Sequence, residues 1–97
     1  MAQSRQLAAI MFTDVIGYTA LMERDEKSAF EVLKKNLRIH QSKISEFHGR
    51  LIKEMGDGVL ASFPTVSDAL NAAINIQKQI NETNEFKLSI GIHQGEV

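Results

Sequence analysis

Residues 50–63 place the strongest constraint on how this chain can fold. Two apolar runs, Leu51–Met55 and Val59–Phe63, are separated by Gly56-Asp57-Gly58. An apolar run, a tight Gly/Asp turn and a second apolar run are typical of a β-hairpin. A carboxylate at the tip of such a turn is held rigidly and remains exposed, which suits a ligand for a metal ion. Asp-Gly is also ordinary turn chemistry, so Asp57 indicates a site only together with a second carboxylate.

Two segments on either side of the hairpin show helical periodicity. Residues 25–48 repeat apolar side chains at three-, four- and seven-residue spacings, with Asp25 as the expected N-cap and Gly49 as the expected terminator. Residues 65–82 repeat them again, directly after Pro64. The apolar stripes expected to face the core are Phe30, Leu33, Leu37, Ile44 and Phe47 in the first helix, and Val66, Ala69, Leu70, Ala73, Ile76 and Ile80 in the second.

Two further strands complete the pattern. Leu7–Phe12 is a continuous apolar run too short for a helix, and Leu88–Ile92 alternates between apolar and small residues. The predicted order is β-α-β-β-α-β, which is the ferredoxin-like α+β fold: an antiparallel sheet with both helices packed on one face. The 97 residues fit one small domain. Many unrelated functions use this fold, so function must be argued from the site.

Composition excludes several classes of function. A net charge of −1 gives no electrostatic reason to expect nucleic acid as a partner. The absence of cysteine excludes disulfides, thiolate metal sites and cysteine nucleophiles. No apolar run is long enough for a membrane segment, and no signal peptide opens the chain, so we expect a cytoplasmic protein. The histidines lack the spacing of a metal site: we expect His40 and His48 on the helix surface or near its end, and His93 on a strand.

A second carboxylate lies just past the first strand, at Asp14. In the predicted fold the first strand and the hairpin are neighbours, so Asp14 and Asp57 can meet at one end of the sheet. Two such carboxylates can hold a pair of hard divalent cations. Gly17 permits a sharp bend after Asp14, where successive backbone N–H groups can form a concavity for an anion.

Three motifs resemble those of the class III nucleotidyl cyclases, the adenylyl and guanylyl cyclase catalytic domains. Phe12–Thr19 is similar to the first metal-binding motif of that family, Lys53–Gly58 to the second, and Ser89–Val97 to the strand that follows. The motifs keep the family's order and spacing, and the resemblance covers the chain from Leu7 onward. It implies that residues 1–97, with a core at residues 7–97, are the N-terminal portion of such a catalytic domain.

The resemblance also implies a role for each matching residue. Asp14 and Asp57 would bind two Mg²⁺ or Mn²⁺ ions, with the backbone carbonyl of Val15 as a further ligand. The backbone amides of three residues would contact the β- and γ-phosphates: Gly17, Tyr18 and Thr19.

Lys53 occupies the position at which the family reads the purine, where lysine accompanies ATP and glutamate accompanies GTP. An ammonium group can donate to N1 of adenine, whereas guanine carries a donor there and favours a carboxylate. The implied reaction is attack of the ribose 3′-oxygen on the α-phosphate of ATP, which forms cyclic AMP and pyrophosphate. Family members are head-to-tail dimers with active sites at the interface, so the resemblance implies a homodimer with shared active sites.

The family domain continues beyond the position of Val97 with a second base-reading residue and with an Asn and an Arg that stabilise the transition state. We therefore expect little or no cyclase activity from these 97 residues alone. Two alternatives stay open at this point. One is a different two-metal enzyme with a ferredoxin-like palm, such as a polymerase or diguanylate cyclase, and the other is a regulatory module that binds nucleotide without turning it over.

Overall fold

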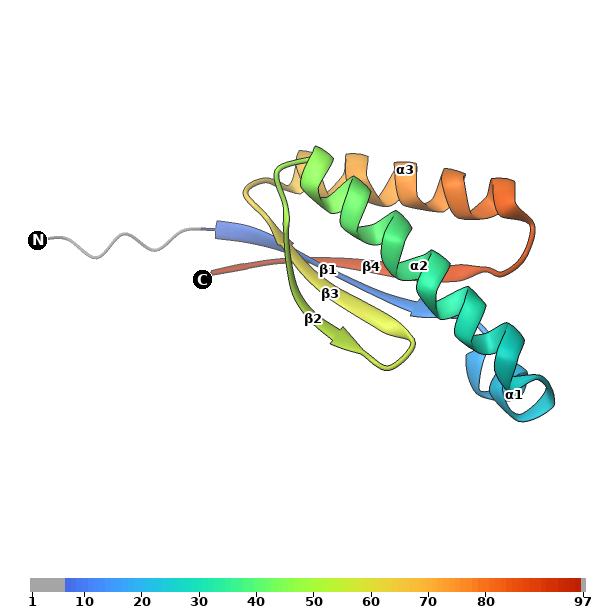
Figure 1. The fold of residues 1–97 in the computed structure, drawn as a ribbon. Coiled ribbons are helices and arrows are strands. Elements are labelled where there is room, and N and C mark those ends of the chain that lie inside the picture. The colour runs from blue at the N-terminus through green and yellow to red at the C-terminus, as the bar shows by residue number, and fades with distance from the viewer. Residues whose placement is uncertain (1–6, 97) are drawn as a thin grey trace, which may run out of the picture.

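The structure, a computed structural model, describes residues 7–96 as a four-stranded antiparallel sheet with three helices (Figure 1). The elements are β1 (Leu7–Val15), α1 (Tyr18–Arg24), α2 (Glu26–Glu46), β2 (Arg50–Met55), β3 (Gly58–Phe63), α3 (Val66–Thr83) and β4 (Leu88–Glu96). The strand order is β2-β3-β1-β4, so the predicted ferredoxin-like α+β fold is confirmed. Residues 1–6 and 97 of the expected domain lie outside the described part of the chain.

Helices α2 and α3 cover one face of the sheet and leave the other uncovered (Figure 1). Met11 and Val15 of β1 are buried under the helices, whereas Phe12 between them is 47% exposed. Such alternation is expected of an antiparallel sheet with one covered face. We call the uncovered side the open face; by strand register it carries Ile10, Phe12 and Asp14 of β1, Leu60 of β3, and Lys53 and Met55 of β2.

Helix α2 turns a different face to the sheet from the one that the sequence predicted. Its buried residues are Ala29, Val32, Asn36, Ile39, His40 and Ile44. Phe30, the first residue of the predicted core stripe, is 51% exposed, and in α3 Leu70 is 48% exposed, so both assignments to the core were wrong. The reason is that the buried face of α2 includes two polar residues, so the apolar periodicity favoured a neighbouring stripe.

The ends of α2 differ in how well they were predicted. Asp25 is the N-cap as expected, because its carboxylate accepts hydrogen bonds from the backbone N–H of Ser28 at 3.1 Å and from its hydroxyl at 2.6 Å. At the other end the left-handed residue is His48, with φ of 66°, and not Gly49. Glycine is needed at position 49 for a different reason: a Cβ atom there would lie 2.4 Å from the ring of Phe63.

Helix α1 was not predicted. It contains no buried residue, so it leaves no apolar stripe in the sequence. Gly17 precedes it with φ of 74°, and the chain then turns back into α2 at the end of the sheet where β1 finishes (Figure 1). Among the helices of residues 7–96, none has the length and apolar character that crossing a membrane requires.

Candidate functional site

Asp14 and Asp57 lie next to each other at one end of the sheet. Asp14 pairs with Gly58 across the β1–β3 ladder, directly after the turn that carries Asp57. The backbone N–H of Val15 donates a hydrogen bond of 3.1 Å to the carbonyl of Asp57, which ties the end of β1 to the hairpin turn. The structure therefore brings together the two carboxylates that the sequence placed on separate motifs.

The two carboxyl groups interact electrostatically. Desolvation of the Asp14 carboxyl and the neighbouring Asp57 carboxyl, which can share a proton with it and repels its negative charge, raise the pKa of Asp14 above its ordinary value. Like charges held side by side disfavour double ionisation unless a cation lies between them. This pair is therefore suited to a positively charged ligand.

Two glycines explain why the hairpin turn holds Asp57 close to β1. Gly56 has φ of 56°, as the first central residue of a two-residue hairpin turn requires. Gly58 faces the backbone of β1, and a Cβ atom at position 58 would lie 2.2 Å from the carbonyl oxygen of Thr13. The glycines on either side of Asp57 thus serve the turn and the close approach of β1.

The segment after Asp14 forms a second part of the site. Gly17 bends the chain, and Tyr18 and Thr19 open α1, where the first backbone N–H groups have no acceptor within the helix. The N–H of Ile16 donates to the carbonyl of Lys87 at 2.9 Å, which anchors this loop to the start of β4. The loop therefore leaves backbone donors at the same end of the sheet as Asp14.

Lys53 reaches the open face through an irregularity in β2. Leu51 pairs with Ala61 on the covered side, but the register shifts after Leu51 so that Lys53 pairs with Leu60 on the open face. Regular alternation would have put Lys53 on the same side as Leu51. The β-bulge thus places this ammonium group on the same face as Asp14, two strands away.

The donor set fits a hard divalent cation with additional ligands from substrate or solvent. Within residues 7–96 no group of three or more His, Cys, Asp or Glu side chains is arranged to hold a metal ion. The chain therefore offers two adjacent carboxylates and backbone carbonyls. Mg²⁺ is commonly held in this way, through one or two carboxylates plus phosphates and water.

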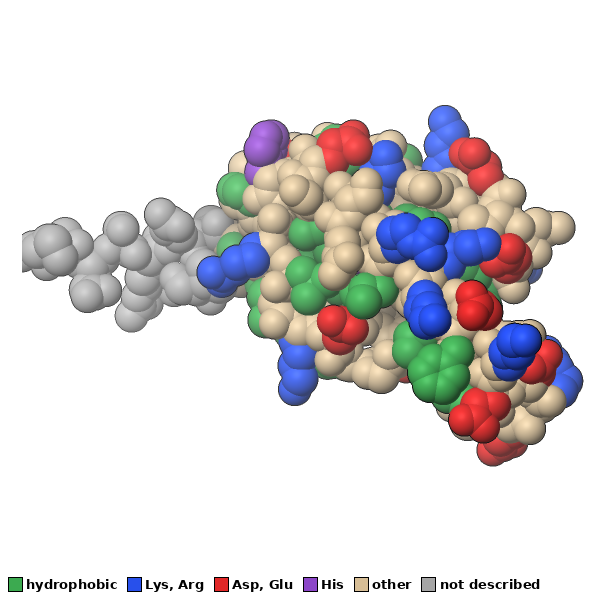
Figure 2. Space-filling view, in the orientation of Figure 1, with side chains coloured by type: hydrophobic (Ala, Val, Ile, Leu, Met, Phe, Trp, Pro, Cys, Tyr) green, Lys and Arg blue, Asp and Glu red, His purple; other side chains and the backbone are tan. Residues whose placement is uncertain are grey.

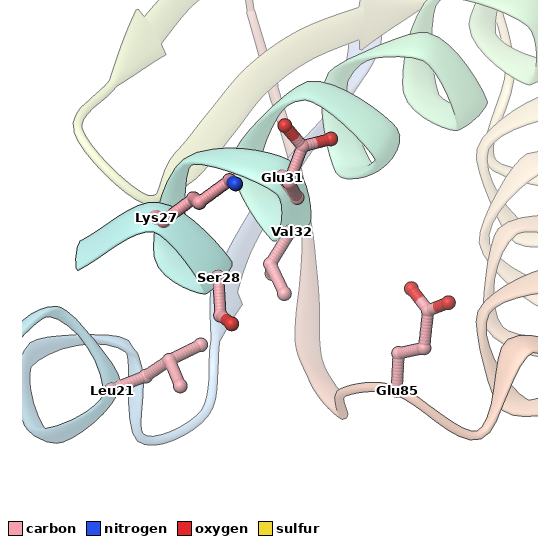
Figure 3. A pocket seen from close by; sticks show the side chains of 6 residues that line it. All are labelled: Leu21, Lys27, Ser28, Glu31, Val32 and Glu85. Atoms are coloured by element: carbon pink, nitrogen blue, oxygen red, sulfur yellow. The ribbon is translucent and has the colours of Figure 1, made fainter. Parts of the chain in front are cut away.

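A separate hollow of about 400 Å³ lies between α1, α2 and the segment before β4 (Figure 3). Its lining residues are Leu21, Lys27, Ser28, Glu31, Val32 and Glu85. Asp14 and Asp57 are absent from this lining. This hollow is therefore distinct from the carboxylate pair. On the face shown in Figure 2, basic and acidic side chains are interspersed, and hydrophobic side chains are exposed where α1 joins α2.

The structure adds one residue near the site that the sequence misassigned. His40 is fully buried and not on the helix surface, and its Nε2 lies 2.9 Å from the hydroxyl of Thr13, the residue before Asp14. In the sequence, His40 could have been recognised only as a polar residue on the buried face of α2. The predicted apolar stripe lay on a different face, so His40 was assigned to the surface. As expected, His48 lies near the end of α2, where it is exposed and 3.5 Å from Asp68, and His93 lies on β4.

Comparison with known proteins identifies the family. A model of the adenylate and guanylate cyclase catalytic domain matches residues 1–97. The chain belongs to this cyclase family. The resemblance seen in the three motifs is therefore confirmed, and a polymerase or diguanylate cyclase palm is not favoured.

Individual relatives agree with this assignment. The chain is 35% identical to "Putative adenylate cyclase 3" of Rhizobium meliloti over 96% of its own length and 17% of that protein. It is 30% identical to an adenylate cyclase of Anabaena cylindrica, of which it covers 22%. The chain thus spans about a fifth of the curated relatives that it matches.

Solved cyclase structures have the same fold. The adenylate/guanylate cyclase/hydrolase of Silicibacter pomeroyi superimposes with a TM-score of 0.84 at 34% identity, over 96% of this chain and 59% of that one. A bacterial light-regulated adenylyl cyclase gives a TM-score of 0.89 at 20% identity, over 98% of this chain and 56% of that one. The second likeness supports the fold alone.

Proposed function

We propose that this chain is the part of a class III adenylate cyclase catalytic domain that binds the metal ions and the triphosphate of ATP. The observation that carries the proposal is the adjacency of the Asp14 and Asp57 carboxylates, in segments that the backbone hydrogen bond from Val15 to Asp57 holds together. In the complete reaction the ribose 3′-oxygen bonds to the α-phosphorus, the bond to pyrophosphate breaks, and the hydroxyl proton is released. The product is 3′,5′-cyclic AMP.

Asp14, Asp57 and the carbonyl of Val15 are the groups that would hold two Mg²⁺ or Mn²⁺ ions. Bound ions of this kind lower the pKa of a hydroxyl group and neutralise charge on phosphate oxygens. The raised pKa of Asp14 supports this assignment, because the carboxylate pair is most stable when its charge is compensated.

The remaining site residues bind and orient the nucleotide. Backbone N–H groups of Gly17, Tyr18 and Thr19 would donate to the β- and γ-phosphates, since the start of α1 leaves them without helical acceptors. Lys53 would donate to N1 of adenine and so favour ATP over GTP.

A homodimer with shared active sites accounts for where Lys53 lies. Two strand spacings, about 10 Å, separate β2 from β1 on the open face. In a head-to-tail dimer, Lys53 of one protomer would read the base while the carboxylates of the other hold the metal ions. The open face has the apolar character that such a contact needs, because Phe12 is 47% and Met55 41% exposed.

Calorimetric titration tests the site directly. Mn²⁺ with a non-cyclisable ATP analogue is titrated into the chain, into Asp57→Ala and into Glu54→Ala. We expect Asp57→Ala to weaken binding at least about tenfold, because it removes one of two carboxylate ligands. Glu54 pairs with Val59 on the opposite side of the hairpin, so its variant should bind like the unaltered chain. Equal binding by all three proteins would overturn the proposal.

A further inference from the structure

His40 is buried in the middle of α2 with both ring nitrogens engaged. Its Nδ1 lies 2.7 Å from the backbone carbonyl of Asn36, and its Nε2 lies 2.9 Å from the hydroxyl of Thr13. A carbonyl oxygen only accepts, so Nδ1 carries the hydrogen and the Thr13 hydroxyl donates to Nε2. Burial lowers the pKa of His40, which keeps the imidazole in this neutral form.

The hydrogen bond adds a directional constraint between α2 and β1, whereas α2 otherwise packs mainly against α1, α3, β2 and β3. The other buried residues of α2 are mostly aliphatic, and aliphatic contacts are non-directional, so they tolerate small displacements along the helix axis. A buried hydrogen bond has a narrow range of lengths and angles. Asn36, 1% exposed, does not duplicate this function, because within the described residues its side-chain oxygen has no hydrogen-bond partner. Within residues 7–96, the His40–Thr13 contact is therefore the directional link between the buried face of α2 and β1.

Each partner of the His40–Thr13 hydrogen bond is connected to the candidate site. Thr13 directly precedes Asp14 and faces the opposite side of β1. Helix α2 packs against α1, which reaches the core itself only through the half-buried Tyr18 and Leu21, so α1 takes much of its position from α2. The proposed phosphate-binding loop, residues 16–19, comprises the two-residue connection after β1 and the first two residues of α1.

We propose that His40 is a positioning residue for the site: its hydrogen bond to Thr13 sets the phosphate-binding loop at the correct place relative to Asp14. The proposal rests on the proposed function of that loop and of Asp14. His40 touches neither nucleotide nor metal in this account and acts only through Thr13 and α2.

Three variants separate positioning from mere support of the core. Thr13→Ser keeps the hydroxyl, and Thr13→Val removes it at nearly the same volume. The double variant Thr13→Val/His40→Leu removes both partners, so neither leaves the other unpaired and the melting temperature should recover. The measurements are the melting temperature, the amide chemical shifts of residues 15–19, and the dissociation constant for Mn²⁺ with the ATP analogue.

If His40 positions the loop, affinity for Mn²⁺ with the ATP analogue should not follow the melting temperature across the variants. Thr13→Ser should bind within about threefold of the unaltered chain, whereas Thr13→Val and the double variant should bind at least about tenfold more weakly, because a displaced loop loses the geometry that binding requires. The amides of residues 15–19 should shift in both weakened variants. If the double variant regains affinity together with its melting temperature, His40 only supports the core and the proposal is wrong. If the unaltered chain does not bind at all, the proposed function fails, and the amide shifts still decide whether His40 positions the loop.

Discussion

At the scale of single residues, the buried imidazole of His40 makes the protein sensitive to acid. Burial lowers the pKa of His40 below the ordinary value of 6.5, so at a pH just below 6.5 the unfolded chain binds a proton there and the folded protein does not. The free energy of unfolding therefore falls as the pH drops below that value, by at most about 1.4 kcal/mol per pH unit.

Urea unfolding between about pH 7 and pH 5.5 measures this dependence. The His40→Gln variant is the control, because glutamine does not titrate while the carboxylates common to both proteins still do. We expect a flatter dependence in the variant. Parallel curves for the two proteins would show that His40 is not the responsible group.

Single residues also show how far sequence reasoning reached into the site. Asp14 and Asp57 could be paired in advance, because the fold makes β1 and the hairpin neighbours; the sequence placed Asp14 just past the first strand, whereas β1 continues through it to Val15. The side of β2 on which Lys53 lies could not, since a one-residue bulge reverses it and nothing in residues 50–63 marks where the bulge falls. His40 was missed because hydrogen bonds to buried polar groups leave no hydrophobic pattern.

At the scale of elements, the connection from α2 to β2 depends on a glycine pressed against the core. A Cβ atom at position 49 would lie 2.4 Å from the ring of Phe63, which is itself 1% exposed. Gly49→Ala should therefore destabilise the protein by about 1–3 kcal/mol, because either the ring or the connection must move.

Gly95→Ala is the matched control for this prediction. Its new Cβ atom would meet nothing closer than the His93 ring at 3.6 Å, which is ordinary contact. Chemical unfolding of the two variants should show a clear loss for position 49 and little change for position 95. Similar losses at both positions would mean that contact with Phe63 does not decide the effect.

Elements with a strong apolar pattern were predicted, and those without one were not. The hairpin, the N-cap of α2 at Asp25 and the extent of α3 follow from local sequence. Helix α1 has no buried residue and so gave no signal. The rotation of α2 was misjudged because tertiary packing, and not the densest apolar stripe, decides which face is buried; Phe30 remained outside.

At the scale of the whole molecule, the open face should govern self-association. Phe12 lies on it, 47% exposed, whereas Ile74 is 62% exposed on α3, on the other side of the sheet. Sedimentation of the chain, of Phe12→Glu and of Ile74→Glu compares the two surfaces. We expect Phe12→Glu to raise the dimer dissociation constant at least about tenfold, because it buries an unpaired charge in the interface.

Ile74→Glu should leave the dimer intact. The opposite ranking of the two variants would place the interface on the helical side. A chain that stays monomeric at all concentrations would contradict the proposed homodimer.

The strand order of the whole sheet was predictable from the sequence, since one hairpin between two helices leaves few ways to order four strands.

Helix α1 affects how the folded protein is cleaved by proteases. No residue of α1 is fully buried, and only Tyr18 and Leu21 pack against the core, so less free energy holds α1 than holds α2 or α3. Segments of this kind open locally more often than the whole domain unfolds. The peptide bond after Arg24, at the end of α1, is then open to a trypsin-like protease in the otherwise native protein. A triphosphate bound to residues 17–19 would hold this helix in place. Resistance to cleavage would thus report occupancy of the site without any turnover.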